Sequence, residues 1–153
     1  MLLSVQSVKP ARLLQACPCG RSGASKKPLA FADCCGRFID HFETTPAPDA
    51  ESLMRSRYSA FVLERGNYLL ATWHATRRPA SIEFEAGVKW LGLEVRLCQA
   101  LDETHAQVEF IARQKSAGEA ALRLHETSRF VFEGSRWYYV EGSQHSKALN
   151  SSQ

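Results

Sequence analysis

The sequence predicts an α+β fold in which helices pack inside a curved antiparallel sheet, preceded by a small zinc knuckle at the N-terminal end. Helical periodicity comes first, over residues 49–74, and alternation of apolar and polar residues with a period of two follows it to residue 140. Four of the five cysteines lie within residues 17–36, before either pattern begins. Helices followed by consecutive antiparallel strands are typical of α+β domains, and their curved sheet makes a concave face.

Length and composition indicate one ordinary domain with a small appendage. The chain has 153 residues, and 44% of them are hydrophobic, which is enough for a packed core. Two prolines within TTPAPD, residues 44–49, predict a linker. We therefore divide the chain into a zinc-binding segment 1–45, an α+β domain 46–142 and a flexible polar tail 143–153.

Charge, hydropathy and the absence of certain motifs argue against several classes of protein. The net charge of +3 is small and the basic residues are spread along the chain, so there is no clear nucleic-acid signal. No apolar run reaches the length of a signal peptide or the ~18 residues of a membrane-spanning helix, and we expect a cytoplasmic protein without a membrane partner. Neither a glycine-rich dinucleotide turn nor a G-x-S-x-G elbow occurs.

Two helices are predicted before the strands. Asp49 has the character of an N-cap and Glu51 that of a first-turn acid, so a helix is expected to begin there. We expect it to continue through Arg65 and to be closed by Gly66. A second, shorter helix is predicted over NYLLATWH, residues 67–74.

Four strands follow, each with one buried face. In the first, apolar residues occupy the odd positions of 91–97, and in the second they occupy the even positions of 107–113. The third strand covers 121–132, and EGS at 133–135 predicts a hairpin turn into a fourth strand at 137–140.

The two tight cysteine pairs indicate a metal site. Zinc prefers four tetrahedral ligands, and sulfur at about 2.3 Å lets a short loop close around the ion. The candidate ligands of one closed, structural Zn²⁺ are Cys17, Cys19, Cys34 and Cys35. His41 is close enough to replace Cys35, and a disulfide or simple reduced thiols are the alternatives. Cys98 is expected in the core.

The linker leads us to expect a knuckle that is independent of the body. Loss of the metal would then disorder residues 17–36 and leave the α+β domain folded.

Two charged residues are predicted to point inward. Arg57 falls within the apolar arc of the first helix, and Glu126 and Ser128 interrupt the apolar face of the third strand. A buried Arg57–Glu126 ion pair is the simplest prediction, because leaving either charge unpaired would cost about 3–5 kcal/mol. The alternative places Arg57 at a pocket, where it is available to an anionic ligand.

Further candidates surround these charges. His74, next to Trp73, could act as a general base in a pocket or cap carbonyls at the end of its helix. The aromatic residues of 137–139 could stack on a ligand, but core and cross-strand pairs are the preferred interpretation. His125 and Arg129 are expected to face away from Glu126. The pocket candidates are Arg57, Tyr58, Trp73, His74, Glu126 and Ser128.

Two sets of motifs carry a family resemblance. CPCG followed by CCG resembles the SEC-C zinc motif known from the tail of the SecA translocase, although here fourteen residues separate Cys19 from Cys34. LMRSRYSAF, ATWH, WLGLEV, HETSRF and RWYYVEG resemble the bacterial YchJ-like family, so that the resemblance covers about residues 17–142. It implies a cone-shaped domain similar to nuclear transport factor 2, with a cavity between helices and sheet.

The resemblance leaves two functions open. The preferred hypothesis is a zinc-binding adaptor whose knuckle, with Arg21, Lys26 and Lys27 nearby, docks a protein or ribosome partner. The alternative is a small-molecule binding protein or an enzyme of the isomerase, cyclase or dehydratase type, with a small ligand in the cavity. Fold similarity alone is a weak basis for assigning such chemistry.

Overall fold

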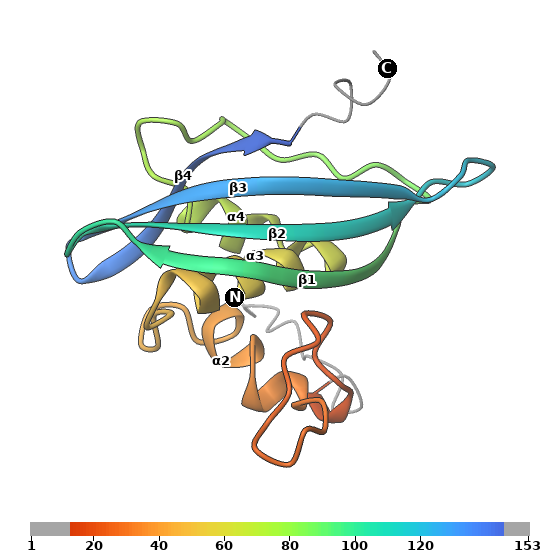
Figure 1. Cartoon of the computed structure of the whole chain (residues 1–153), viewed down its shortest axis with the longest axis horizontal. Coiled ribbons are helices and arrows are strands. Elements are labelled where there is room, and N and C mark those ends of the chain that lie inside the picture. Colours follow the sequence, from red (N-terminus) through yellow and green to blue (C-terminus); the bar gives the residue numbers. More distant parts are fainter. Residues whose placement is uncertain (1–12, 146–153) are drawn as a thin grey trace, which may run out of the picture.

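The structure is a computed structural model that describes residues 13–145 (Figure 1). A short helical region comes first, and four strands then form one antiparallel sheet in sequence order. The elements are η1 (Phe31–Asp33), α2 (Gly36–Ile39), α3 (Ala50–Val62), α4 (Gly66–Ala71), β1 (Lys89–Ala100), β2 (His105–Lys115), β3 (Leu122–Glu133) and β4 (Arg136–Gln144). The predicted α+β class is confirmed.

One layer of helices covers one face of the curved sheet. Figure 1 shows α3 and α4 along that face, with the orange N-terminal segment and α2 below the sheet in this view. Helix α3 contacts β1, β2 and β4, so it is the central element of the core. Its Leu53 packs with Leu69 of α4 and with Val108 and Phe130 of the sheet, and all four side chains are almost fully buried.

Helix α3 begins as predicted but ends earlier. The Asp49 N-cap is confirmed, because its Oδ1 accepts a hydrogen bond from the backbone N–H of Ser52 at 2.7 Å. The helix ends at Val62 instead of Arg65, since Glu64 adopts a left-handed conformation with φ of 56°. Gly66 then begins α4 instead of closing α3.

The predicted hairpin between the last two strands is confirmed. Gly134 and Ser135 both have positive φ, 57° and 66°, which is the backbone of a two-residue type I′ turn. Strand β4 continues to Gln144, so residues 143 and 144 are strand residues and not part of a tail. The rest of the predicted tail, from 146, lies outside the described residues.

The alternation predicted for β1 is interrupted by two register shifts. Pairing with β2 skips Leu91 and Arg96, and Leu91 and Leu97 are 52% and 51% exposed. Each bulge moves the following side chains to the other face of the sheet. The prediction that Cys98 is a core residue is wrong, because it lies near the start of α3, is exposed, and donates a hydrogen bond to Glu51 Oε1 at 3.4 Å.

No helix within residues 13–145 is long and apolar enough to cross a membrane.

Candidate metal centre and ligand cavity

The two cysteine pairs meet in a single buried cluster. The Sγ atoms of Cys17, Cys19, Cys34 and Cys35 all lie within 4.8 Å of one another. Cys19 Sγ and Cys34 Sγ are 3.6 Å apart, close to the ~3.8 Å between two sulfurs of a tetrahedral ion with ligands at about 2.3 Å. All five cysteines of the chain are free, which removes the disulfide alternative. The four thiols therefore could hold a metal ion.

Local backbone structure brings the two pairs together. The first pair sits in a turn in which Gly20 N–H donates to Cys17 O at 3.1 Å, and the second pair joins η1 to α2. Cys17 N–H donates to Leu29 O at 2.8 Å, which returns the loop between the pairs to its start. His41 lies outside the cluster and is exposed, so Cys35 occupies the fourth position.

The thiols affect one another's ionisation. Hydrogen bonds from Cys19 and Cys34 lower the pKa of the Cys17 thiol. Hydrogen bonding to Cys17 raises the pKa of both Cys34 and Cys35, since a proton retained on one sulfur stabilises the charge on another. Four thiolates in so small a volume need a cation between them, which is the chemistry of a tetrathiolate metal site.

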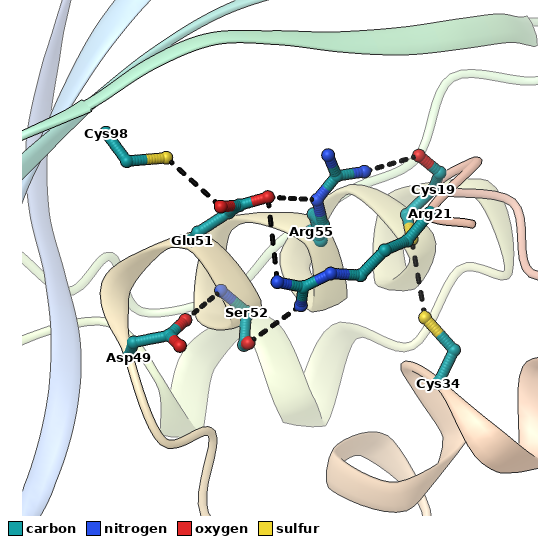
Figure 2. Close-up of polar contacts among 8 residues, drawn as sticks. All are labelled: Cys19, Arg21, Cys34, Asp49, Glu51, Ser52, Arg55 and Cys98. Atoms are coloured by element: carbon teal, nitrogen blue, oxygen red, sulfur yellow. Dashed lines mark hydrogen bonds and ion pairs between the residues drawn. The ribbon is translucent and has the colours of Figure 1, made fainter. Parts of the chain in front are cut away.

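The knuckle, residues 17–36, is joined to α3 by a polar network (Figure 2). Arg55 donates to Cys19 O at 3.0 Å and to Glu51 Oε2 at 2.8 Å. Arg21 donates to Ser52 Oγ at 3.0 Å and lies 3.7 Å from Glu51. Burial acts to raise the pKa of Glu51, but the hydrogen bonds from Arg55 and Cys98 and the positive charges of the two arginines together outweigh it and lower that pKa.

Apolar packing also crosses the predicted linker. The four cysteines belong to the same buried cluster as Leu53 and Leu69, and Cys17 Sγ lies 3.5 Å from Ser59 Oγ of α3. The knuckle was expected to be independent of the α+β domain because a linker joins them. In the structure the knuckle packs directly against α3, so the two parts are not separate.

A cavity of about 190 Å³ lies between α3 and the sheet. Arg57, Tyr58, Trp73, Glu126 and Ser128 line it, as predicted from the sequence. The remaining walls are Met54, Phe61, Trp90, Phe110, Ala112, Leu124, Phe130 and Tyr139, so that the lining is mostly apolar and aromatic.

Arg57 is buried without a carboxylate partner. The residue is only 6% exposed, and within residues 13–145 no acidic oxygen lies within the 4.0 Å limit of an ion pair with it. The predicted buried Arg57–Glu126 pair is therefore wrong, although both residues point inward as expected. Neutral hydrogen-bond acceptors and aromatic rings contact the Arg57 guanidinium instead of a carboxylate, and these contacts stabilise its charge.

Those neutral groups contact one end of the guanidinium, and two aromatic rings lie beside it. Nη1 donates to Leu69 O and to Thr72 Oγ1, each at 2.7 Å. The rings of Tyr139 and Trp73 lie 4.5 and 5.1 Å from the guanidinium carbon, within cation–π range. Burial lowers the pKa of Arg57 to about 10, so the group stays charged at neutral pH. Nε and Nη2 make no hydrogen bond to any described residue.

A second group of polar atoms lines the cavity near Gly142. A Cβ atom placed on Gly142 would lie 3.2 Å from Tyr139 Oη, 3.4 Å from Ser128 Oγ and 3.6 Å from Glu126 Oε2. The absence of a side chain at 142 thus keeps space among three oxygens. Trp73 Nε1 is buried and has no hydrogen-bond partner in the described part of the chain, and other atoms of the Trp73 side chain line the cavity.

Three other predicted residues lie outside the cavity. His74 binds Thr76 Oγ1 at 2.8 Å and Glu133 at 3.0 Å, so it neither lines the cavity nor caps carbonyls. His125 and Arg129 face away from Glu126 as expected, and their partners are carboxylates of β2 and β4.

The sequence prediction missed part of the aromatic wall. Tyr139 was assigned to core and cross-strand packing, and Trp90 preceded the predicted start of the first strand. Phe61 belongs to the same apolar arc of the first helix as Arg57. The helical periodicity could therefore have placed Phe61 in the cavity wall. For Tyr139 the bulge between Arg129 and Phe130 in the β3–β4 register hides the signal.

Comparison with known proteins identifies the domain and the knuckle. A family model described as YchJ, middle NTF2-like domain, matches residues 49–142. A UPF0225 protein of Polaromonas sp. is 71% identical over 87% of this chain and 97% of its own length. A UPF0225 protein of Chromobacterium violaceum is 50% identical over 90% of this chain and 98% of its own.

Two solved structures are similar along most of the chain. A SEC-C motif containing protein from Psychrobacter arcticus has a TM-score of 0.72 and 31% identity, and the match covers 90% of this chain and 86% of that one. A SEC-C motif containing protein from Rhodopseudomonas palustris has a TM-score of 0.70 and 30% identity, with 86% and 100% covered. The expected cone-like domain and its cysteine knuckle are thus confirmed.

Proposed function

The chain belongs to the UPF0225 family and carries the YchJ-type NTF2-like domain, and from this premise we propose that it is a small-molecule binding protein. The site is the cavity between α3 and the sheet. The observation that supports the proposal is the buried Arg57 guanidinium, whose Nη1 donates to two neutral acceptors while Nε and Nη2 have no acceptor within residues 13–145. A buried charge with unused donors is costly unless a ligand or water satisfies them.

The lining defines the class of ligand. Aromatic walls favour a flat apolar body, and Arg57 favours an acceptor group such as a carboxylate or carbonyl. Glu126, Ser128 and Tyr139 supply a polar group for the far end of the ligand. The volume of about 190 Å³ is suited to a molecule little larger than benzene, which fills a cavity of about 150 Å³.

Tryptophan indole signals offer a direct test. Trp73 and Trp90 line the cavity, whereas Trp137 packs elsewhere in the core, so its signal is an internal control. Titration of ¹⁵N-labelled protein with benzoate should shift the Trp73 and Trp90 indole signals in a saturable way and leave Trp137 in place. Benzene should shift them too, but Arg57→Met should weaken only benzoate binding. Unchanged Trp73 and Trp90 signals at saturating benzoate would refute the proposal.

We propose Zn²⁺ as the ion of the cysteine cluster and the cytoplasm as the compartment. Tetrathiolate sites with a closed first shell are typical of structural zinc, and thiols stay reduced in the cytoplasm. In this role the metal holds the knuckle against α3 and takes no part in ligand chemistry.

A second proposed function is the docking of an acidic partner, such as the ribosome surface, by the knuckle. Lys26 and Lys27 are exposed on the orange loop that lies on the side of the molecule away from the sheet in Figure 1. Arg21 is held by Ser52 and Glu51 and is less available. Lys26→Glu with Lys27→Glu should abolish cosedimentation with purified ribosomes, and Lys89→Glu on β1 is the control. Equal sedimentation of all three proteins would exclude this role.

A further inference from the structure

Three side chains with metal-binding atoms converge on the outer face of the sheet, away from the cavity. Glu109 comes from β2, His125 from β3 and His145 from the residue directly after β4. One ligand atom from each lies within 4.8 Å of the others. The backbones are adjacent because His145 N–H donates to His125 O at 2.7 Å, which extends the β3–β4 ladder.

The two imidazoles are held in a parallel stack. Their ring centroids are 3.9 Å apart and the planes differ by 6°. His125 Nε2 lies 2.6 Å from Glu109 Oε2, and His145 Nε2 lies 2.8 Å from Thr127 Oγ1. Strands β2 and β3 fix the Cα positions of Glu109 and His125, and the backbone hydrogen bond to His125 O holds His145 beside them.

The three side chains are of the types that bind transition metals. Imidazole nitrogens beside a carboxylate are standard donors for late first-row transition metals. A divalent cation would neutralise the carboxylate and use one nitrogen of each ring.

We propose that Glu109, His125 and His145 form a second metal site, which binds a divalent transition-metal ion such as Zn²⁺. The His₂Glu set supplies three ligands of a tetrahedral ion, and because His145 is exposed, the fourth position is open to water. To share one ion, the exposed His145 ring must turn out of the stack, because nitrogen lone pairs lie in the ring planes and two parallel rings direct them along separate planes. The His125–Glu109 contact must also open from 2.6 Å to about 3.3 Å, which rotation of a half-buried glutamate allows.

The open coordination position should make the metal ion exchange faster at this site than at the cysteine cluster. The tetrathiolate is buried and closed, so its ion should exchange slowly. The His₂Glu ion is partly hydrated and should be removed by mild dialysis against a chelator that leaves the thiolate-bound ion in place. This difference lets the two sites be loaded separately in the full-length protein.

Cobalt substitution with calorimetry tests the inference. Full-length protein that retains its thiolate-bound zinc should bind about one further equivalent of Co²⁺, with visible bands of nitrogen and oxygen ligation and without sulfur charge-transfer bands. His145→Ala should weaken this step at least tenfold, and Glu109→Gln should weaken it as well. His145 follows the last strand, so its removal does not threaten folding.

The control is His105→Ala, because His105 is an exposed histidine that contacts Asp102 in the β1–β2 loop. It should bind the second Co²⁺ like the unaltered protein. Either of two results would overturn the inference: no second equivalent in the unaltered protein, or equal affinity in His145→Ala and His105→Ala.

Discussion

At the scale of single residues, Arg57 determines what the cavity can bind. Removing a guanidinium from water costs several kcal/mol, and here two neutral acceptors and two aromatic rings offset part of that cost. The sequence correctly predicted that this residue points inward. It could not predict the partners, because Leu69 O is a backbone atom and Thr72 is the C-cap residue of α4, which no sequence pattern links to Arg57.

A double-mutant cycle separates this arrangement from a buried ion pair. Arg57→Met, Glu126→Gln and the double variant should show a coupling below about 0.5 kcal/mol, since the two side chains do not form an ion pair. Denaturant unfolding of the four proteins supplies the measurement. A coupling of 2 kcal/mol or more, of the order expected for a desolvated pair, would restore the pairing that the structure excludes.

Gly142 should be needed for binding more than for stability. Its absent side chain keeps space among Tyr139 Oη, Ser128 Oγ and Glu126 Oε2, and an added Cβ would lie 3.2 Å from the first of them. Gly142→Ala should therefore reduce benzoate affinity several-fold while changing the free energy of unfolding by about 1 kcal/mol or less. Ser143→Ala, on the opposite face of β4, is the matched control. Equal affinities for both variants would contradict the assignment of this space to the ligand.

Cys98 should be an exposed but unreactive thiol at neutral pH. Burial raises its pKa to about 11, and the Glu51 carboxylate, which accepts its hydrogen bond, acts in the same direction. The thiolate is the nucleophile, so the rate of alkylation by iodoacetamide should rise with pH until about 11. Glu51→Gln should move the midpoint of this profile downward. A midpoint near the ordinary ~8.5 in the unaltered protein would be inconsistent with the contact.

At the scale of elements, α3 connects the two candidate sites. Ser52, Arg55 and Ser59 contact the knuckle, and Arg57 and Tyr58 line the cavity. The N-cap and the inward arc of this helix followed from local chemistry and periodicity. The early end of α3 could not be predicted in this way, because the residue with the left-handed backbone is Glu64 and not Gly66.

The strands also show what the sequence pattern could and could not predict. Period-two alternation located all four, and the inward faces of β2 and β3 were correct because these central strands pair with each other without a bulge. In β1 the two register shifts exchange the faces, and sequence alternation cannot reveal a shift that arises from pairing. The error at Leu97 has this cause, because Leu97 pairs with Glu109 on the outer face. Cys98 pairs with Val108 and faces the helices, but it is exposed beside Glu51 at the start of α3.

At the scale of the whole molecule, the knuckle and the domain should unfold together. The four cysteines share one buried cluster with the residues of α3 and α4, and Arg55 and Arg21 bridge the boundary. Tight cysteine pairs were readable from the sequence, but a proline-rich segment does not show whether the parts that it joins pack on each other.

Metal removal therefore should weaken the entire fold. Cys35→Ser, or zinc extraction by a strong chelator, should lower the midpoint of a single cooperative thermal transition by 10 °C or more, on the order of several kcal/mol. Cys98→Ser, which removes a thiol outside the cluster, should leave it unchanged. Loss of structure confined to residues 17–36, with an unchanged transition for the domain, would show that the knuckle is independent.

The proposed ligand binding in the cavity depends on Arg57, which would hold the acidic group of the ligand. Isothermal titration with benzoate tests this most directly, with Arg113→Met as a control because Arg113 is exposed on β2 and lies outside the cavity lining. The loss of charge-assisted hydrogen bonds should cost about 1.5–3 kcal/mol, so Arg57→Met should weaken binding roughly 10- to 150-fold while Arg113→Met binds like the unaltered protein. Equal affinity in Arg57→Met and Arg113→Met would contradict the account.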